Sequence, residues 1–228
     1  MTENAASSES TVERAERDRL RPRFHYTPLR GWINDPNGLV QWRGRHQLFA
    51  QHNPDAPVWG PMHWAHAEGP DGVHWRNLPI ALRPPSPVSP DDQSGIFSGN
   101  AVDDNGVLTV FYTVFSDVRA RPGAVPETVG TATSTNGVEF VPYAGNPVIA
   151  ERPAESEAGF RDPYVFRDPT DDRWKLAIGS GQDGRGNVHL YASDDLRQWT
   201  YVGVLARGDG STGGMWECPS FFLLGDSW

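Results

Sequence analysis

Short apolar runs separated by polar turns recur along the chain, and they set the first expectation about its architecture. Each run opens a segment with the pattern strand, polar turn, second strand, which is the signature of a β-hairpin. Three of the turns have the sequences RGR at 43–45, DDNG at 103–106 and RDPTDD at 167–172. The segments begin at Asn34, Ser98, Arg161 and Glu217. The pattern predicts a protein of short antiparallel strands with little helix.

A longer repeat joins these hairpins into units of about 60 residues. Later in each unit, a second polar turn is followed by an aromatic residue and another short strand. The aromatic residues are Trp75, Phe140 and Trp199, spaced 65 and 59 residues apart. A unit of this length with about four strands is typical of a β-propeller blade. We therefore expect an all-β propeller with three units and the start of a fourth, and a β-sandwich is the less favoured alternative.

Composition and charge narrow the class of protein. The chain has 29 acidic and 20 basic residues, for a formal net charge of −9, and no Lys- or Arg-rich run. Phosphate binding needs a basic face, so we expect no nucleic-acid partner. No apolar run approaches the roughly 18 residues that a membrane helix needs, so we expect no membrane partner. Nine Trp, 24 Gly and 20 Pro suit a turn-rich β-protein with a sugar-binding site.

The N-terminal part of the chain differs from the rest. Residues 1–23 form a polar tail, either disordered or a short surface helix, and residues 24–228 form the partial propeller domain. The tail lacks the apolar core of a secretory signal, and a single cysteine, Cys218, permits no disulfide within the chain. We expect a cytoplasmic protein, and the sequence leaves its oligomeric state open.

The tripeptide Arg-Asp-Pro occurs twice, at 161–163 and 167–169, and the two copies need different interpretations. Asp168 falls in a predicted hairpin turn, where Asp and Pro are ordinary residues, so we interpret it as structural. Asp162 falls at the start of a unit. Because the first strand of each propeller blade lines the central channel, Asp162 is the candidate for chemistry.

Two other acids are predicted to share the place of Asp162 in the repeat. They are Asp35 and Glu217, while the second unit has Ser98 there. Each acid alone has a structural interpretation, as a turn residue, a salt-bridge partner or an edge residue. Together they should face one another across a funnel, where like charges raise the pKa of at least one carboxyl group. Paired carboxylates of this kind suit the cleavage of a glycosidic bond.

Six stretches of the chain occur in a characteristic order and spacing. They are GWINDPNGL (31–39), QHNP (51–54), WGPMHWAHAEGPDGVHWRNLPIAL (59–82), GIFSGNAV (95–102), FRDPYVF (160–166) and WECPSFF (216–222). This set resembles the motifs of glycoside hydrolase family 32, the invertase, levanase and inulinase family, over nearly all of residues 24–228. The resemblance implies a five-bladed β-propeller of which this chain covers about three and a half blades. The other blades and a C-terminal β-sandwich would be missing.

The resemblance also implies roles for individual residues. It implies a retaining β-fructofuranosidase in which Asp35 is the nucleophile, Glu217 the general acid and base, and Asp162 the stabiliser of the transition state. Five residues match the family's other sugar-contacting positions: Asn34, Gln51, Trp59, Ser98 and Arg161. Phe97 is a candidate for the aromatic wall of the pocket. Sucrose or a fructan would be the substrate, and the chemistry needs no metal and no organic cofactor.

Other conspicuous residues have structural interpretations. We expect Trp64, Trp75 and Trp199 to pack between blades, and Trp32 is a further candidate for the pocket wall. Cys218 follows the proposed acid on a predicted strand, so its side chain should point away from the funnel. The histidines lack the spacing of a metal-ligand set.

Several alternatives stay open. The same scaffold could transfer fructose to another sugar, act on an arabinose-containing substrate, or bind carbohydrate without catalysis. The motif WINDPNG in the first unit argues against the arabinose alternative. The sequence does not distinguish sucrose, sucrose phosphate, inulin and levan. Because the sequence stops at LLGDSW, we expect an incomplete propeller that is inactive or poorly folded alone.

Overall fold

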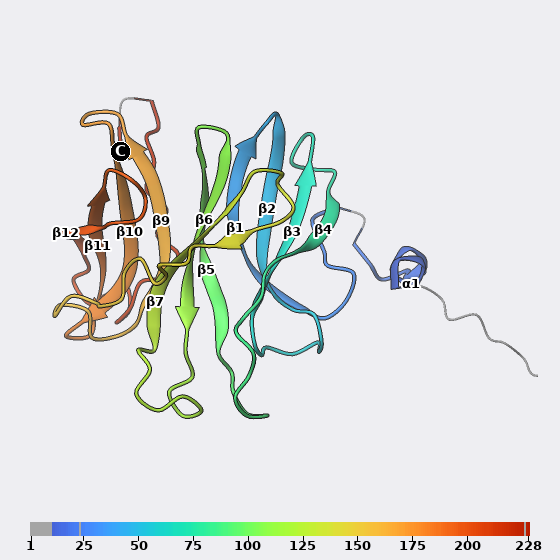
Figure 1. Ribbon diagram of the computed structural model, residues 1–228, viewed down its shortest axis with the longest axis horizontal. Helices are drawn as coiled ribbons and strands as arrows, with labels where there is room; N and C mark the ends of the chain where they lie inside the picture. The colour runs from blue at the N-terminus through green and yellow to red at the C-terminus, as the bar shows by residue number, and fades with distance from the viewer. Residues whose placement is uncertain (1–10, 23, 226) are drawn as a thin grey trace, which may run out of the picture.

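The computed structural model describes residues 11–22, 24–225 and 227–228. Over these residues the strands form three four-stranded antiparallel sheets (Figure 1). The first sheet contains β1 (Trp32–Trp42), β2 (Arg45–Asn53), β3 (His63–Gly69) and β4 (Arg76–Leu82). The second contains β5 (Gly95–Asp104), β6 (Val107–Phe115), β7 (Glu127–Ser134) and β8 (Val141–Pro142). The third contains β9 (Phe160–Asp168), β10 (Arg173–Gln182), β11 (Arg185–Ser193) and β12 (Thr200–Arg207).

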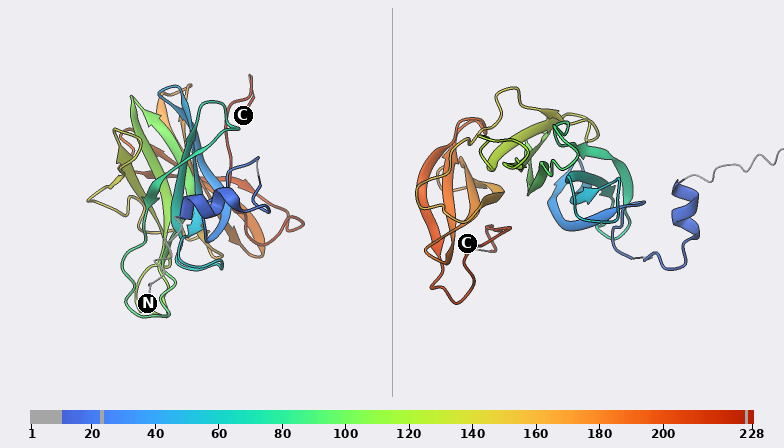
Figure 2. Two further views of the ribbon diagram at one scale, coloured as in Figure 1. Left: turned by 90° about the vertical axis from the view of Figure 1, so that its right-hand side faces the viewer. Right: turned by 90° about the horizontal axis from the view of Figure 1, so that it is seen from below.

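The three sheets are arranged as consecutive blades of a β-propeller. In each sheet the strands follow one another in chain order, and seen from below the sheets stand along an arc (Figure 2). The first strands β1, β5 and β9 are neighbours, because Ser98 of β5 bonds to Asp35 of β1 and Asn100 of β5 bonds to the backbone of β9. The predicted all-β propeller portion is therefore confirmed, and the β-sandwich alternative is not.

Local turn chemistry explains why the hairpins form where the sequence predicts them. The loop between β1 and β2 consists of Arg43 and Gly44, and the loop between β5 and β6 consists of Asn105 and Gly106. All four residues have positive φ, between 48° and 86°. Two-residue loops of this kind match the twist of the strands that they join, and glycine adopts the required backbone without strain.

Aromatic residues fill the spaces between blades. Trp64 is fully buried in an apolar cluster that joins the first and second sheets, and Phe140 packs against that cluster. Trp199 packs in the same way against a cluster shared by the second and third sheets. The predicted packing role of Trp64 and Trp199 is confirmed, while Trp75 precedes β4 and is only half-buried.

The segment that was expected to open a fourth blade contains no strand among its described residues. After β12 the only β-bridge among the described residues joins Leu224 and Ser227. A single strand with no neighbouring strand would leave its backbone N–H and C=O groups unpaired. This segment packs on the third sheet instead. Trp216 N–H donates to Ser180 O over 3.1 Å. The described chain thus comprises three blades and one irregular segment, rather than three and a half blades.

The N-terminal segment carries the only helix among the described residues, α1 (Thr11–Arg17). The tail predicted over residues 1–23 therefore includes one short helix, while residues 1–10 and 23 lie outside the described residues. Within the described part of the chain, no helix is long and apolar enough to span a membrane.

Buried histidines lead to a prediction about acid stability. His66 is 1% exposed, stacks on Phe49 at 4.3 Å, and donates from Nε2 to Gln47 Oε1 over 2.8 Å. Burial lowers its pKa from 6.5 to about 3. In the unfolded chain the His66 side chain therefore takes up a proton near pH 6.5, whereas in the folded protein it takes up that proton only near pH 3. The free energy of unfolding should fall as the pH drops through this window, by up to about 1.4 kcal/mol per pH unit from His66.

Urea unfolding at a series of pH values measures this slope, and the variant His66→Gln provides the comparison. Glutamine can still donate to Gln47 but does not titrate, so the slope should be shallower in the variant. Burial also lowers the pKa values of His52, His63 and His189, so part of the slope remains. Equal slopes in the two proteins would show that His66 does not contribute.

Candidate active site

The first strands of the three blades share an irregularity at the predicted site. At this point each has one residue more than the strand opposite, so the pairing shifts at Asp35 in β1, at Ser98 in β5 and around Asp162 in β9. Such β-bulges redirect side chains and are frequent beside active sites. Gly99 follows one bulge, and a Cβ atom there would lie 2.0 Å from Phe111 O. The common place predicted for Asp35, Ser98 and Asp162 therefore has a structural basis.

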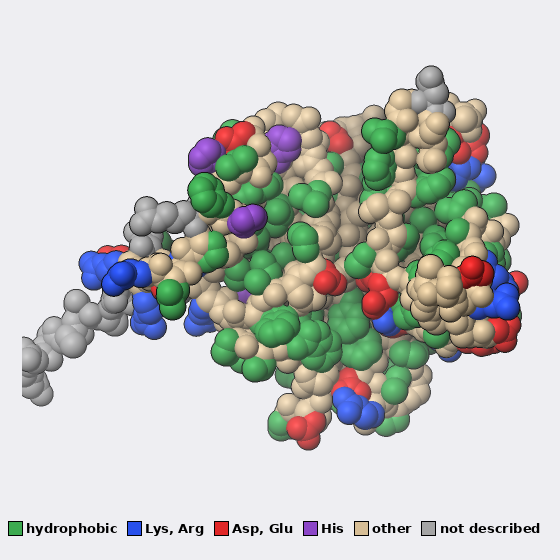
Figure 3. Space-filling view, turned by 180° about the vertical axis from the view of Figure 1, so that it is seen from behind, with side chains coloured by type: hydrophobic (Ala, Val, Ile, Leu, Met, Phe, Trp, Pro, Cys, Tyr) green, Lys and Arg blue, Asp and Glu red, His purple; other side chains and the backbone are tan. Residues whose placement is uncertain are grey.

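Side chains from all three blades and from the segment after β12 converge on one open cavity. Its volume of about 540 Å³ suits a small sugar. Every predicted site residue except the wall candidate Trp32 lines it: Asn34, Asp35, Gln51, Trp59, Phe97, Ser98, Arg161, Asp162 and Glu217. Three further residues complete the lining, namely Phe115, Glu127 and Cys218. Acidic side chains lie near the middle of the face seen in Figure 3, between the two outer blades.

Asp35 is oriented by the neighbouring blade. Ser98 Oγ donates to Asp35 Oδ2 over 3.0 Å, so β5 fixes one oxygen of the β1 carboxylate. The preceding residue, Asn34, accepts a hydrogen bond from Trp32 Nε1 over 2.8 Å. Gln51 is 2% exposed and donates to Ile96 O over 3.0 Å, which joins β2 to β5 at the cavity wall.

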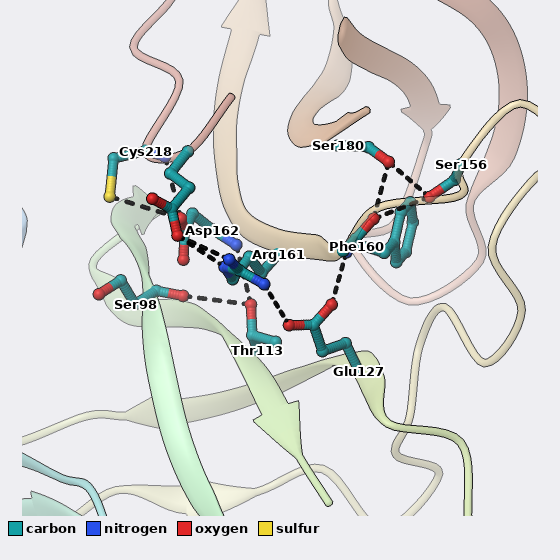
Figure 4. Close-up of polar contacts among 11 residues, drawn as sticks. Ser98, Thr113, Glu127, Ser156, Phe160, Arg161, Asp162, Ser180 and Cys218 are labelled. Carbon is teal, nitrogen blue, oxygen red and sulfur yellow. Dashed lines mark hydrogen bonds and ion pairs between the residues drawn. The ribbon is translucent and has the colours of Figure 1, made fainter. Parts of the chain in front are cut away.

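Asp162 is the most buried acid of the site, with 6% of its surface exposed. Its backbone N–H donates to Thr113 Oγ1 over 2.9 Å, and its Oδ2 accepts from the backbone N–H of Cys218 over 2.9 Å (Figure 4). Burial raises the pKa of Asp162, while the hydrogen bonds from Cys218 and the charge of Arg161 oppose this rise. The carboxyl group is thus held rigidly between two blades and the C-terminal segment.

Arg161 joins two acids that are far apart in the sequence. Its Nη1 donates to Glu127 Oε1 over 2.6 Å, while Nε and Nη2 donate to Glu217 Oε1 over 2.9 Å and 2.7 Å. Burial alone would lower the pKa of Arg161, but its bonds to the two carboxylates raise it above the ordinary value. The guanidinium group therefore stays charged and connects the second blade, the third blade and the segment after β12.

Cys218, rather than Glu217, takes the backbone conformation of Asp35 and Asp162. All three residues precede a proline, and their φ angles are 47°, 25° and 63°. Glu217 stands one residue earlier, so the prediction that it shares the place of the two aspartates is wrong by one position. Its side chain nevertheless reaches the same cavity and bonds to Arg161.

The same finding corrects the prediction for the Cys218 side chain. A strand would direct it away from the funnel, but the left-handed backbone at this residue breaks the alternation of side chains. Its Sγ lies 3.5 Å from Asp162 Oδ2 and lines the cavity. Desolvation in the cavity wall and the negative charge of Asp162 raise the pKa of the thiol. The thiol therefore stays protonated and donates to the carboxylate.

Aromatic side chains form one wall of the cavity. Phe97 stacks on Phe115 with ring centroids 4.4 Å apart, and Trp59 meets Phe97 edge to face at 6.1 Å. Trp59 is 48% exposed, so its ring is accessible to a ligand. Trp32, the other aromatic candidate, contacts Asn34 but is not part of the lining.

The described residues include no group of three or more His, Cys, Asp or Glu side chains arranged to hold a metal ion. The charged groups of the cavity are instead four acids, Asp35, Glu127, Asp162 and Glu217, and one arginine that pairs with the two glutamates. Carboxylates that converge beside an aromatic wall are the arrangement that glycosidases use.

Sequence comparison identifies the family. The family model described as "Glycosyl hydrolases family 32 N-terminal domain" matches residues 25–227, and the chain belongs to this family. Sucrose-6-phosphate hydrolase of Escherichia coli is 43% identical over 208 residues, which are 90% of this chain and 42% of that protein. Levanase of Bacillus subtilis is 38% identical over 210 residues, 90% of this chain and 29% of that protein.

A solved structure of similar fold agrees with this assignment. The family 32 β-fructofuranosidase of Bombyx mori has a TM-score of 0.78 and 39% identity, covering 90% of this chain and 42% of that protein. The chain therefore spans less than half the length of these relatives.

Proposed function

We propose that this chain carries the site of a retaining β-fructofuranosidase, which releases terminal fructose from sucrose or a fructan. The observation that carries the proposal is the convergence of Asp35, Asp162 and Glu217 on one sugar-sized cavity beside Arg161. Relatives named for the hydrolysis of sucrose 6-phosphate and of levan support a fructosyl substrate.

The reaction would proceed by two displacements. An oxygen of Asp35 attacks the anomeric carbon of fructose, the bond to the leaving sugar breaks, and Glu217 gives its proton to the leaving oxygen. Glu217 then takes a proton from water, whose oxygen displaces Asp35 and releases fructose. A retaining pair of this kind has its carboxyl groups about 5–5.5 Å apart.

Asp162 and the polar groups of the cavity would bind the fructosyl hydroxyls. Hydrogen bonds to a charged group contribute about 1.5–3 kcal/mol each. They accelerate the reaction where they strengthen in the transition state, as positive charge develops on the ring. The rigid support of Asp162 by Thr113 and Cys218 suits this role.

The proposal extends to the organisation of the whole protein. Residues 1–23 would be a polar N-terminal segment and residues 24–228 the first part of a five-bladed propeller domain. The protein would act in the cytoplasm, which cell fractionation can test.

Fructose release from sucrose, sucrose 6-phosphate and inulin tests the proposed function. The 228-residue chain is compared with a chain extended through any downstream reading frame, each beside its Asp35→Ala control. Release that disappears in the control supports the proposal, and kestose-type products at high sucrose would favour transfer. Sugar binding without release by either chain would favour a carbohydrate-binding protein.

A further inference from the structure

Glu127, the first residue of β7, is an acid of the cavity to which the proposed reaction assigns no role. Its Oε1 accepts from Arg161 Nη1 over 2.6 Å, and its Oε2 accepts from the backbone N–H of Phe160 over 2.6 Å (Figure 4). The Glu127 side chain is 10% exposed, and that of Arg161 is 25% exposed. Both oxygens of this carboxylate are therefore engaged in a largely buried place, at the first two residues of β9, the strand that carries Asp162.

Arg161 poses a chemical difficulty for a general acid at Glu217. Its guanidinium group donates twice to Glu217 Oε1, which fixes the direction of that side chain. A positive charge at hydrogen-bond distance also favours the carboxylate over the carboxylic acid. A general acid must hold its proton until the leaving oxygen receives it. An arginine that orients Glu217 without compensation would therefore weaken it as an acid.

The charged and titratable groups that face the Arg161–Glu217 pair come from every neighbouring element: Asp35 from β1, Glu127 from β7, Asp162 from β9, and Cys218 from the segment after β12. Asp35 bonds to Ser98, and Asp162 bonds to Cys218. Among the described residues, Glu127 is the only acid besides Glu217 that forms an ion pair with Arg161.

We propose that Glu127 is a positioning residue that balances the charge of Arg161, so that Arg161 orients Glu217 while Glu217 keeps its proton. This role rests on the proposed function of Glu217 as general acid. Glu127 acts through Arg161 and not by contact with substrate. Because Glu127 lies on the second blade and Glu217 after the third, the same three side chains also fix the segment after β12 to the site.

Titration of the Glu217 carboxyl carbon by ¹³C NMR tests this proposal directly, and it does not require an active enzyme. The signal is assigned with Glu217→Gln. Replacing Glu127 by glutamine removes the balancing charge, so the titration midpoint of Glu217 should fall by about half to one pH unit. Glu139→Gln is the matched control, because it removes one exposed acid from the outer end of the same blade and should leave the midpoint unchanged.

A second variant keeps the proposal open to refutation if Glu127→Gln does not fold. Glu127→Asp keeps the negative charge but moves it away from Arg161 by the length of one carbon–carbon bond. The titration midpoint of Glu217 in this variant should therefore lie between those in the native chain and in Glu127→Gln. An unchanged or higher midpoint in the folded variants would overturn the proposal.

Kinetics provide an independent readout if the chain hydrolyses sucrose. The alkaline limb of kcat/KM should move to lower pH in Glu127→Gln and largely return in Glu127→Asp. A purely structural role would lower activity without moving the limb, and this result would also overturn the proposal. Absence of hydrolysis in both the 228-residue chain and the extended chain would count against the proposed function, while the NMR titration would still decide the role of Glu127.

Discussion

Replacing Asp35 by asparagine is expected to lower fructose release from sucrose by at least about four orders of magnitude. The amide has nearly the same size and can still accept the hydrogen bond from Ser98 Oγ. It is far less nucleophilic than a carboxylate, so the covalent fructosyl intermediate of the proposed mechanism should not form. The binding of fructose should change little. Initial rates by coupled fructose assay and binding by calorimetry measure the two quantities.

Asp168→Asn is the matched control for this experiment. Asp168 ends β9 and accepts from Thr170 N and Oγ1 over 2.9 Å and 2.7 Å, so it stabilises the turn to β10. The same substitution there should lower stability slightly and leave kcat/KM within about twofold of the native value, as for surface positions away from the site. A similar loss of activity in both variants would show that Asp35 supports the fold and is not the nucleophile.

The blades could be predicted from the sequence because their signals are local. Polar turn residues such as Arg43-Gly44 and Asn105-Gly106 fix the hairpins without reference to the rest of the chain. The repeated spacing of Trp75, Phe140 and Trp199 then groups the hairpins into blades. Asp35 and Asp162 could be predicted to lie together for a related reason, since a repeat places equivalent residues at equivalent depth.

The parts of the site that the sequence did not reveal depend on contacts between distant residues. Glu127 meets Arg161 across 34 residues, and nothing around Glu127 in the sequence distinguishes it from an ordinary surface acid. In the sequence, Phe115 is simply the last residue of an apolar strand. Its place in the cavity follows from its stacking on Phe97.

Cys218 carried a signal that sequence reasoning overlooked. The triplets Asn34-Asp35-Pro36, Arg161-Asp162-Pro163 and Glu217-Cys218-Pro219 align on their prolines. This alignment places the cysteine with the two aspartates, as their shared positive φ bears out. The acid of the last triplet is therefore offset by one residue, and it occupies the position of Arg161 in the preceding blade. The offset explains why Glu217 meets Arg161 while Cys218 meets Asp162.

Replacing Glu217 by glutamine is expected to lower the rate with sucrose by about 10²–10⁴-fold, because glutamine has no proton to give to the leaving oxygen. The loss should depend on the leaving group. A nitrophenyl β-fructofuranoside releases an anion that is already stable in water, so formation of the covalent intermediate should be nearly unaffected. Hydrolysis of that intermediate should be slow, since it needs Glu217 as the base. Stopped-flow measurements should therefore show a burst of nitrophenol followed by slow turnover.

Azide distinguishes a missing base from a distorted site. It is already anionic and needs no general base, so it should restore turnover in Glu217→Gln and yield a fructosyl azide of retained configuration. In Asp35→Asn, azide should yield no fructosyl azide of retained configuration, because no covalent intermediate forms with which azide could react. If Glu217→Gln lost equal activity on both substrates and azide failed to rescue it, the importance of Glu217 would lie in its bonds to Arg161, where Oε1 accepts from Nε and Nη2. The leaving-group dependence and the azide rescue therefore distinguish a role of Glu217 in proton transfer from a role in supporting the site. The ion pair with Arg161 is compatible with both roles.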